Sequence, residues 1–552
     1  MLSQGERAAL RRLSVFRGRF TLDSALAVAV TEDADPRLMK ESVVALASKS
    51  LVSSEVDDKV VHYRLLETTR AYAFQQLVAS NELADIQRRH AVLMCDVIAA
   101  DPMAAIAVSS ESWVASKVPH IDDVRAALEW AFAPGGDAQI GVRLTTAAIP
   151  LCTHLVLLDE FRVRVDAARK HASKVVDSDP LLEMRLNIAF LALSAQTIGP
   201  NPEMDEAARR AIFLSEDPRL ETYRAEAINS GWSCAWGNGH YSESLRCVKI
   251  LKARARSQGD SVGVLAAERM TAQSLHFLGK HDEASVLANR VIAHPSQIRR
   301  LSSMQPIALD RRVSMRIILA RIHWIQGRVD QAVHAVHECL ALAAGDMGYG
   351  HCQALAFAAC PIALWIDDRK MAETFIAQLR EKARKLNLSY WERWAINFSV
   401  ILNGRADPMG SMSLTPLPLR IEEYDHKQWD VVSTFDIAYD HSTTFERAVA
   451  GECGWCAAEI FRARGTRLLA QGEAGFEEAQ RLFDAALDAA REQQALSWEL
   501  RAVMSLSRLW VLQGRTAEAR STLTAVFEQF SEGQSSSDLQ RARGLLAEMN
   551  TA

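Results

Sequence analysis

The chain has 552 residues, 49% hydrophobic and 24% charged, a composition that can fill a large core and excludes disorder as the dominant state. Its 63 basic and 68 acidic side chains give a net charge of −5, so the basic excess typical of nucleic-acid or anionic-membrane binders is absent. No secretory signal follows Arg7 and Arg11, and no stretch reaches the roughly 18 apolar residues that span a bilayer. We expect a protein that stays in the cytoplasm.

The first 96 residues predict a winged-helix domain. Apolar residues at helical spacing indicate helices over about 10–16, 24–30 and 36–50, with Thr21 or Asp23 capping the second and Asp35 opening the third. The period then changes to two, and residues 51–55 and 60–65 predict a β-hairpin. A further helix is expected from about Glu67 to Ser80.

Charge in this domain favours a protein surface over DNA as its contact. Residues 1–96 hold 13 Lys and Arg against 13 Asp and Glu. The third helix would be the recognition helix, and it offers Arg37, Lys40 and Lys49 against Glu41. Asp57 and Asp58 at the hairpin tip would repel phosphate. Because phosphate contacts supply most of the affinity for DNA, we expect packing against another protein domain, with direct DNA binding as the alternative.

A repeated motif begins at about residue 180, in which a helix ends in glycine and an Ala or Ser follows five residues later. Clear copies start at Gly239, Gly279, Gly327 and Gly514. Gly472 starts a copy with an insertion, and Asp367 starts a degenerate copy without glycine. The period of roughly 40 residues is typical of stacked helix hairpins. Glycine suits the turn because it takes a left-handed conformation at low cost, and the small residue lets the second helix approach closely.

These patterns predict five segments along the chain. They are a winged helix over 1–96, a helical connector over 97–178, tetratricopeptide-like repeats over 179–403, an irregular loop over 404–445 and further repeats over 446–552. Pro408, Pro416 and Pro418 forbid a continuous helix in the fourth segment, which we interpret as a long loop or a damaged repeat.

No pattern of catalytic or cofactor-binding residues stands out. The sequence has no phosphate-binding Gly-x-x-x-x-Gly-Lys-Ser/Thr loop, and Gly231, Gly237 and Gly239 lie between expected helices, where helix termination explains them. Without such a loop we do not expect autonomous ATP hydrolysis. We therefore predict a protein that is not an enzyme, with no catalytic residue, no cofactor and no metal site.

Two short patterns have metal-ligand spacing, and structural roles explain both better. Cys453 and Cys456 could form a redox pair or half a zinc site, but no second ligand pair is near in the sequence. His334 and His337 share one helix face, where a metal would need further ligands from another hairpin. The nine Cys, an odd number, indicate buried thiols in a reducing compartment. Most of the 12 Trp are expected in repeat cores, with a minority on the concave binding face.

Several stretches carry a family likeness. Near the start they are 13–22 (LSVFRGRFTL), 46–52 (LASKSLV), 63–73 (YRLLETTRAYA), 88–91 and 124–131, and near the end 455–459, 490–494 and 497–502. Together they resemble the winged helix and the terminal tetratricopeptide-like repeats of bacterial STAND-type regulatory ATPases. In that family a DNA-binding or cyclase domain and a nucleotide-binding domain usually precede the winged helix.

The resemblance implies a transcriptional or signalling regulator whose repeats sense an inducer or partner. Because this chain begins at the winged helix, it also implies that a partner chain supplies the ATPase, or that the chain is a truncated descendant. In related switches the residues after the hairpin contact nucleotide, and His62, Tyr63 and Arg64 are the nearest positions here.

The predicted fold is mainly α, with a small winged-helix module followed by a right-handed superhelix of tetratricopeptide-like hairpins. The predicted function is regulatory: the repeat groove binds a protein partner, such as an ATPase domain in trans, or a small inducer. The alternatives are a DNA-binding transcription factor that uses the winged helix directly and a nucleotide-dependent switch completed by a separate ATPase domain. No membrane partner is expected.

Overall fold

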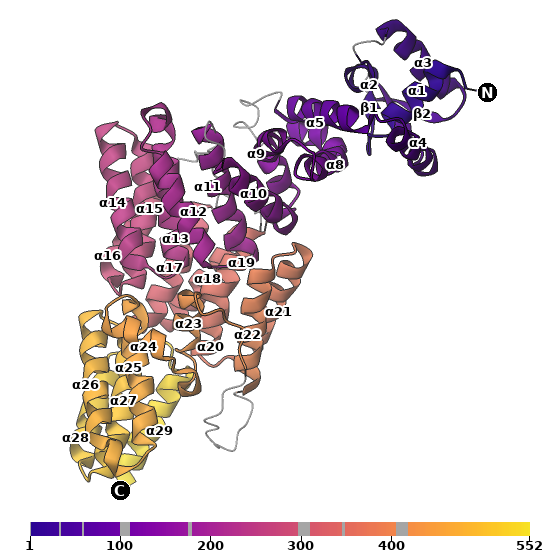
Figure 1. The fold of residues 1–552 in the computed structure, drawn as a ribbon. Coiled ribbons are helices and arrows are strands. Elements are labelled where there is room, and N and C mark those ends of the chain that lie inside the picture. The colour runs from indigo at the N-terminus through magenta and orange to yellow at the C-terminus, as the bar shows by residue number, and fades with distance from the viewer. Residues whose placement is uncertain are drawn as a thin grey trace. The chain divides into compact units, whose positions relative to one another are not determined.

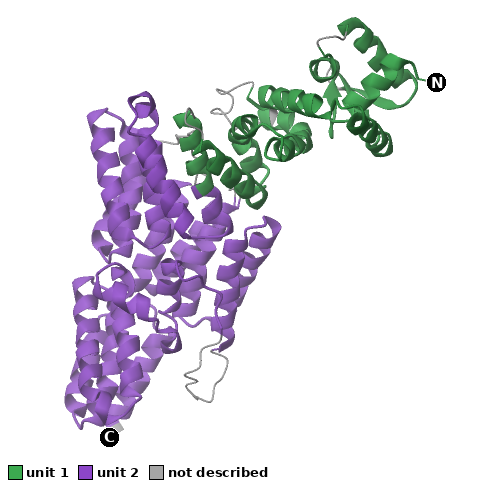
Figure 2. Cartoon of the chain, viewed as in Figure 1, with its two compact units in different colours: residues 1–190, 301–307 green, residues 191–300, 308–552 purple. Residues whose placement is uncertain are grey.

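The computed structural model describes residues 2–31, 35–57, 60–99, 111–174, 179–295, 310–344, 348–404 and 418–551. The fold is mainly α, with a winged helix at the N-terminus followed by tetratricopeptide-like hairpins, as the sequence predicts (Figure 1). It divides into two compact units (Figure 2). The first holds residues 1–190 with 301–307, and the second, called the repeat unit below, holds 191–300 and 308–552. Among the described helices, none is long and apolar enough to cross a membrane.

The winged helix occupies the start of the first unit. Its elements are α1 (Gln4–Leu13), β1 (Phe20–Thr21), α2 (Leu22–Ala29), α3 (Pro36–Ser48), β2 (Val52–Asp57), β3 (Val60–Leu65) and α4 (Glu67–Ala79). The antiparallel sheet has the order β1–β3–β2, with Phe20 opposite Tyr63 and Val52 opposite Leu65. All four side chains are buried in one cluster with residues of α1, α2, α3 and α4, which fixes the register of the hairpin.

Local sequence explains where these helices begin. Ser3 and Glu6 form a capping box at α1, and Thr21 caps α2 by accepting a hydrogen bond from the Ser24 amide. Asp35 caps α3, with a proline in its first turn. The predicted helices and hairpin are confirmed in type and order, and Thr21 rather than Asp23 is the cap of the second helix.

A group of helices follows the winged helix within the first unit. They are α5 (Leu83–Ala99), α7 (Glu111–Lys117), η1 (Val118–His120), α8 (Ile121–Ala131), α9 (Ala138–His154), α10 (Leu158–Ala172) and the first part of α11 (Pro180–Thr197). The boundary between the two units falls inside α11, whereas the sequence predicts the change from connector to repeats at 178–179.

Asp123 ties these helices to the winged helix. Its carboxylate is fully buried and accepts hydrogen bonds from the backbone amides of Arg17 at 2.6 Å and Gly18 at 3.1 Å. The same group lies 3.1 Å from Nε2 of His90 on α5. Two of the stretches that carry the family likeness, 13–22 and 88–91, therefore meet at one buried carboxylate.

The repeat unit consists of helices paired along the chain. From the rest of α11 these are α12 (Pro202–Leu214), η2 (Pro218–Tyr223), α13 (Arg224–Gly237), α14 (Tyr241–Ser257), α15 (Ser261–Phe277), α16 (His281–Ala293), α17 (Arg311–Ile325) and α18 (Val329–Ala343). Next come α19 (Tyr349–Ala354), the π-helical turn η3 (Leu355–Ala359), α20 (Cys360–Trp365), α21 (Arg369–Lys385) and α22 (Ser389–Gly404). The last are α23 (His426–Val432), η4 (Ile437–Tyr439), α24 (Ser442–Val449), α25 (Gly454–Leu469), η5 (Glu473–Gly475), α26 (Phe476–Glu492), α27 (Leu496–Leu512), α28 (Thr516–Phe527) and α29 (Ser537–Thr551).

The hairpin turns follow the predicted glycine motif. Gly239, Gly279, Gly327 and Gly514 all have left-handed backbone conformations, with φ between +78° and +83°. In each turn the next amide bonds back to the preceding helix, as when His240 N–H donates to the Ala235 carbonyl at 2.8 Å. Asp367, the residue of the degenerate copy, takes φ 62° in the same role. The turn motif is thus confirmed, including the copy without glycine.

The segment predicted as an irregular loop, 404–445, differs from that expectation where it is described. Residues 405–417 lie outside the described residues. After them the chain forms α23, which Asp425 caps by accepting a hydrogen bond from the Gln428 amide at 3.0 Å. Lys427 and Asp430 of this helix are at most 1% exposed, so α23 lies inside the repeat unit. Burial in the repeat interior, rather than the prolines, decides the structure of this part.

The C-terminal hairpins meet the earlier ones end to end. A Cβ atom on Gly454, the first residue of α25, would lie 2.4 Å from the carbonyl oxygen of Leu278, just after α15. At the next pair, the Ser497 hydroxyl of α27 donates to the Trp324 carbonyl near the end of α17 at 2.6 Å. Figure 1 shows the two rows, α25–α28 beyond the ends of α14–α17. The repeat unit is therefore held by contacts between hairpins far apart in the sequence.

Candidate functional site

The charged face of α3 is the first candidate surface. Of the three basic residues predicted for the recognition helix, Lys49 follows the end of α3 and forms an ion pair with Glu6 at 2.6 Å. Arg37 and Lys40 are exposed beside Glu41, and the three line a shallow depression on α3. The helix therefore presents two basic side chains against one acidic one, a small charge for holding a phosphate backbone.

Exposed apolar side chains are concentrated on the winged helix. Of the 17 exposed large hydrophobic side chains found in the described chain, eight lie here: Leu38, Val44, Val56, Val60, Val61, Leu66, Tyr72 and Val78. They belong to α3, to the two strands of the hairpin, to α4 and to the residue before it. Because apolar surface of this kind gains free energy against another protein and gains nothing from phosphate, it favours a protein contact.

The positions that the family likeness places nearest to a nucleotide have different environments. Tyr63 is buried against Phe20, with ring centroids 6.1 Å apart, and belongs to the core of the domain. His62 is half-buried and Arg64 is exposed. Asp58 and the side chain of Asp57 lie outside the described residues.

A second candidate site lies inside the repeat unit, around the buried ring of Phe277 at the end of α15. Six side chains have a ring centroid or cationic group near the centroid of this ring: Trp236 at 5.7 Å, Tyr241 at 4.7 Å, His276 at 5.0 Å, Arg321 at 5.3 Å, Lys427 at 5.4 Å and Trp455 at 6.1 Å. We call these residues and Phe277 the Phe277 cluster. They come from α13, α14, α15, α17, α23 and α25, so both rows of hairpins contribute.

Lys427 is a buried cation surrounded by aromatic rings. The side chain is 1% exposed, and its Nζ lies 3.0 Å from the ring centroid of Trp236 and 5.2 Å from that of Phe357. Within the described chain Nζ has no hydrogen-bond partner. Burial holds the pKa of Lys427 well below its usual range, although the charges of Asp425 and Asp430 oppose this shift, and the nearby Arg321 lowers the pKa further. Cation–π attraction offsets part of this desolvation.

Arg321 is the second buried cation. Its guanidinium lies 4.2 Å from the ring centroid of Trp455, and burial lowers its pKa to about 10. Nε donates to Nε2 of His276 at 2.9 Å, and Nη1 donates to the Phe357 carbonyl at 2.9 Å. That carbonyl belongs to the π-helical turn η3, a departure from the α-helix that is frequent at functional sites.

Two neutral histidines, His276 and His281, form a hydrogen-bonded chain with Arg321. Burial, followed by the charge of Arg321, holds the pKa of His276 well below its usual range and lowers the pKa of His281 to about 3. Because Arg321 can only donate, Nε2 of His276 accepts, and the His276 proton lies on Nδ1. This Nδ1 of His276 lies 3.2 Å from Nδ1 of His281 and donates to it, so the His281 proton lies on Nε2. That N–H is buried and meets no acceptor among the residues described.

Two buried carboxylates accompany the cations. Asp430 on α23 pairs with Arg447, whose Nη2 lies 3.1 Å from the carboxylate and also donates to the Gly239 carbonyl at 2.9 Å. Through its two bonds, Arg447 holds α23 against the turn between α13 and α14. Asp425 is also buried, and desolvation raises its pKa to about 6. The carboxylates therefore fix α23 in the interior.

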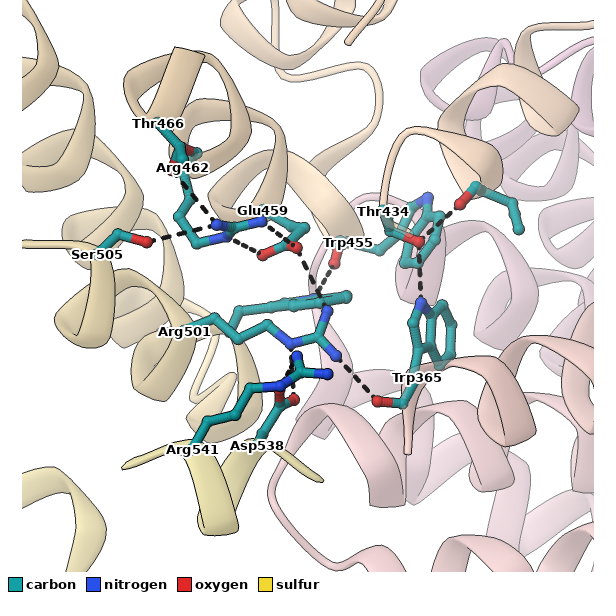
Figure 3. A network of polar contacts seen from close by, with 12 residues as sticks. Trp365, Thr434, Trp455, Glu459, Arg462, Thr466, Arg501, Ser505, Asp538 and Arg541 are labelled. Atoms are coloured by element: carbon teal, nitrogen blue, oxygen red, sulfur yellow. Dashed lines mark hydrogen bonds and ion pairs between the residues drawn. The ribbon is translucent and has the colours of Figure 1, made fainter. Parts of the chain in front are cut away.

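A neighbouring network is fully paired by contrast. Arg501 donates to Asp538 at 2.7 Å, to Glu459 at 3.3 Å and to the Trp365 carbonyl at 3.0 Å (Figure 3). The Trp365 indole donates to Thr434 at 2.9 Å. Because its cations and carboxylates meet directly, this network acts as a structural link between the two rows of hairpins.

The two patterns with metal-ligand spacing are placed differently. Cys453 and Cys456 are buried free thiols at the start of α25, and burial raises the pKa of Cys456 well above its usual range. Buried thiols of high pKa are poor nucleophiles. His334 is an exposed side chain 3.6 Å from Glu338, and His337 lies against Phe375. Across the described ranges no group of three or more His, Cys, Asp or Glu is placed to hold a metal.

Three tryptophans of the repeat unit have the core positions expected for most of the Trp residues. Trp324, Trp391 and Trp394 are at most 2% exposed, and Trp324 stacks on Trp365 with ring centroids 4.5 Å apart. Trp236 is half-buried and forms one side of the Phe277 cluster. The sequence did not predict the cluster itself, because Lys427 lay in the expected loop. The signal that could have found it is Asp425, a helix cap before the run from Trp429 to Val432.

Comparisons with known proteins support the assignment of the N-terminal domain as a winged helix. Residues 2–78 match the family of winged helix-turn-helix domains. Proteins from Mycobacterium bovis and Mycobacterium tuberculosis, named by inference as HTH-type transcriptional regulators, are 35% identical to this chain over 131 residues. That stretch is 24% of this chain and 15% of each relative, so the chain matches only a small part of their length.

Solved structures that align with this chain have low sequence identity and low TM-scores. One is a STAND protein, a signal transduction ATPase with numerous domains, with a tetratricopeptide repeat sensor, from Pyrococcus horikoshii. It has 11% identity and a TM-score of 0.27, over 100% of this chain and 65% of that one. Another is yeast Tom70, with 12% identity and a TM-score of 0.18, over 86% and 94% of the two chains. Similarity at this level has no bearing on function.

Proposed function

We propose that this chain is a cytoplasmic regulatory protein, not an enzyme, whose winged helix contacts a protein domain and whose repeats sense a protein partner or a small inducer. The match to winged helix-turn-helix domains and the names of the mycobacterial relatives support a role in regulation, in transcription above all. The predicted domain organisation, with repeats on both sides of the segment 404–445, is part of this proposal.

The exposed apolar side chains of the winged helix are the observation that supports a contact with a protein domain. Leu38 is 61% exposed and Tyr72 is 62% exposed, whereas the basic residues Arg37 and Lys40 lie beside the acidic Glu41. A DNA-binding helix gains affinity from cations at its surface, and α3 offers two. A protein partner would bury the apolar side chains, each worth about 1–2 kcal/mol on the usual area scale. An ATPase domain in trans is the partner that the family likeness suggests.

Two measurements on the full chain test this function. Fluorescence anisotropy with a labelled duplex, at about 50 mM and about 200 mM salt, should give no saturable binding at either concentration, because few phosphates would be neutralised. Calorimetric titration with a STAND-type ATPase domain from the same organism should give binding that Leu38→Glu with Tyr72→Glu abolishes.

Arg37→Ala with Lys40→Ala is the matched control for that titration. It should leave binding to the ATPase domain within about threefold, because it removes charge and no apolar surface. Tight, salt-dependent duplex binding that this double variant abolishes would instead establish the direct DNA-binding function.

A further inference from the structure

The Phe277 cluster holds more hydrogen-bond donors than acceptors. Five of its atoms are buried and have no partner in the described part of the chain: Nε1 of Trp236, Oη of Tyr241, Nη2 of Arg321, Nζ of Lys427 and Nε1 of Trp455. The orphan N–H of His281 adds a sixth. Native proteins leave few buried polar groups unpaired, since each costs about 1–3 kcal/mol. Five donors around a single ring therefore point to a group that accepts hydrogen bonds.

The charges in the same region do not balance. Three buried cations, Arg321, Lys427 and Arg447, accompany two buried carboxylates, Asp425 and Asp430. Asp430 is paired with Arg447, and no carboxylate of the described residues lies within ion-pair distance of Arg321 or Lys427. With Lys427 protonated, one positive charge thus remains in a region shielded from water, where an uncompensated charge is strongly unfavourable. A single negative charge would neutralise it.

We propose that the Phe277 cluster binds a small organic monocarboxylate. Its one negative charge matches the excess of one cation, and two carboxylate oxygens offer about four lone-pair sites to the donors of Arg321, Lys427 and Tyr241. The aromatic rings of Trp236, Phe277 and Trp455 supply the apolar surroundings that the organic part requires. This assignment rests on the sensing role proposed above and names the chemical class of the inducer.

Helix α23 is the element that would respond to the ligand. It contributes Lys427, and its residues His426, Gln428 and Trp429 also carry buried polar atoms that have no partner in the described ranges. A seven-residue helix held with unpaired polar groups opens more easily than the long helices around it. Bound carboxylate would pair with Lys427 and hold α23 closed.

Calorimetric melting of the full chain tests the assignment. Sodium butyrate at about 100 mM should raise the midpoint of the repeat-unit transition by about 2–4 °C over sodium chloride of equal ionic strength, given a Kd of about 1 mM. Butyramide, the neutral amide of the same shape, should give no shift beyond that of the chloride buffer. The result does not depend on the winged helix or on a partner, so it is separate from the tests above.

Variants test whether the butyrate-induced shift of the melting midpoint arises in the Phe277 cluster. Lys427→Met should lose the butyrate shift while remaining folded, and Tyr241→Phe should reduce it. Lys385→Met, which changes an exposed lysine on α21, should keep the shift. In hydrogen exchange, butyrate should slow the amides of α23 at least threefold in the wild-type chain and leave them unchanged in Lys427→Met. Equal shifts with butyramide, an unchanged shift in Lys427→Met, or no butyrate shift at all would each overturn the assignment.

Discussion

Replacing Lys427 by methionine should stabilise the protein in buffer without carboxylates. Methionine keeps the length of the side chain and its contact with Trp236, and it removes an ammonium group that is 1% exposed. Desolvating an ammonium without a hydrogen bond costs several kcal/mol, and the cation–π contact at 3.0 Å returns about 2 kcal/mol. We therefore expect Lys427→Met to raise the free energy of unfolding by about 1–3 kcal/mol at pH 7.

The advantage of methionine should shrink as the pH rises. The pKa of Lys427 is lowered in the folded chain, so between that pKa and 10.5 the unfolded chain binds more protons than the folded chain. Wild-type stability then increases with pH, by up to about 1.4 kcal/mol per pH unit, and Lys427→Met lacks this term. Asp425, Asp430 and Arg321 face the same group, and their titration is common to both chains, so it largely cancels in the difference.

Urea unfolding followed by tryptophan fluorescence measures this difference at pH 7, 8 and 9. Ten of the 12 Trp lie in the repeat unit, so the signal reports that unit. Lys385→Met, at an exposed position, is the control and should change stability by less than about 0.5 kcal/mol at every pH. A loss of stability in Lys427→Met at pH 7, or a gain independent of pH, would refute the reasoning.

Three further predictions concern the fold. Asp123→Ala should destabilise the first unit by about 3–5 kcal/mol in thermal unfolding, because two amides and a histidine lose their acceptor, whereas Asp122→Ala at a side chain 62% exposed should cost less than about 1 kcal/mol. Gly514→Ala should cost about 1–2 kcal/mol in urea unfolding for its left-handed backbone alone. Gly327→Ala should cost at least about 1 kcal/mol more, because its Cβ would lie 2.9 Å from two side chains; equal costs would contradict the role of close packing. Glu82 has a pKa lowered to about 2 by hydrogen bonds to two arginines. Its contribution to the free energy of unfolding is therefore present above pH 4.5 and lost as the pH falls toward 2. After screening by solvent it is about 1 kcal/mol, and Glu82→Gln should flatten this part of an acid-unfolding curve.

Features set by neighbouring residues could be predicted from the sequence. The turns at Gly239 and Gly327 follow from one residue type and its left-handed conformation, and Asp367 shows that the surrounding helices impose that conformation even without glycine. The winged helix was equally accessible, since Thr21 and Asp35 cap their helices through hydrogen bonds to residues two or three positions away. Local chemistry fixes these elements.

The interior site could not be predicted in the same way. From the sequence Lys427 is expected to be a surface residue in a segment that follows three prolines. Its burial depends on Trp236 and Phe357, which lie far away in the sequence. Nothing near Arg321 indicates that its guanidinium would bond a carbonyl of a π-helical turn. Contacts of this range arise from the packing of the two rows, which periodicity does not encode.

The end-on meeting of α15 with α25 and of α17 with α27 constrains how this protein can lengthen or shorten during evolution. In a simple array each hairpin touches only its neighbours in the chain, and one can be gained or lost without disturbing distant ones. Here Gly454 fits against Leu278 and Ser497 against Trp324, so an extra hairpin inside one row would separate joints that the other row holds at a fixed spacing. Variation in hairpin number among its descendants should therefore occur outside the joined stretch, or as matched insertions in both rows.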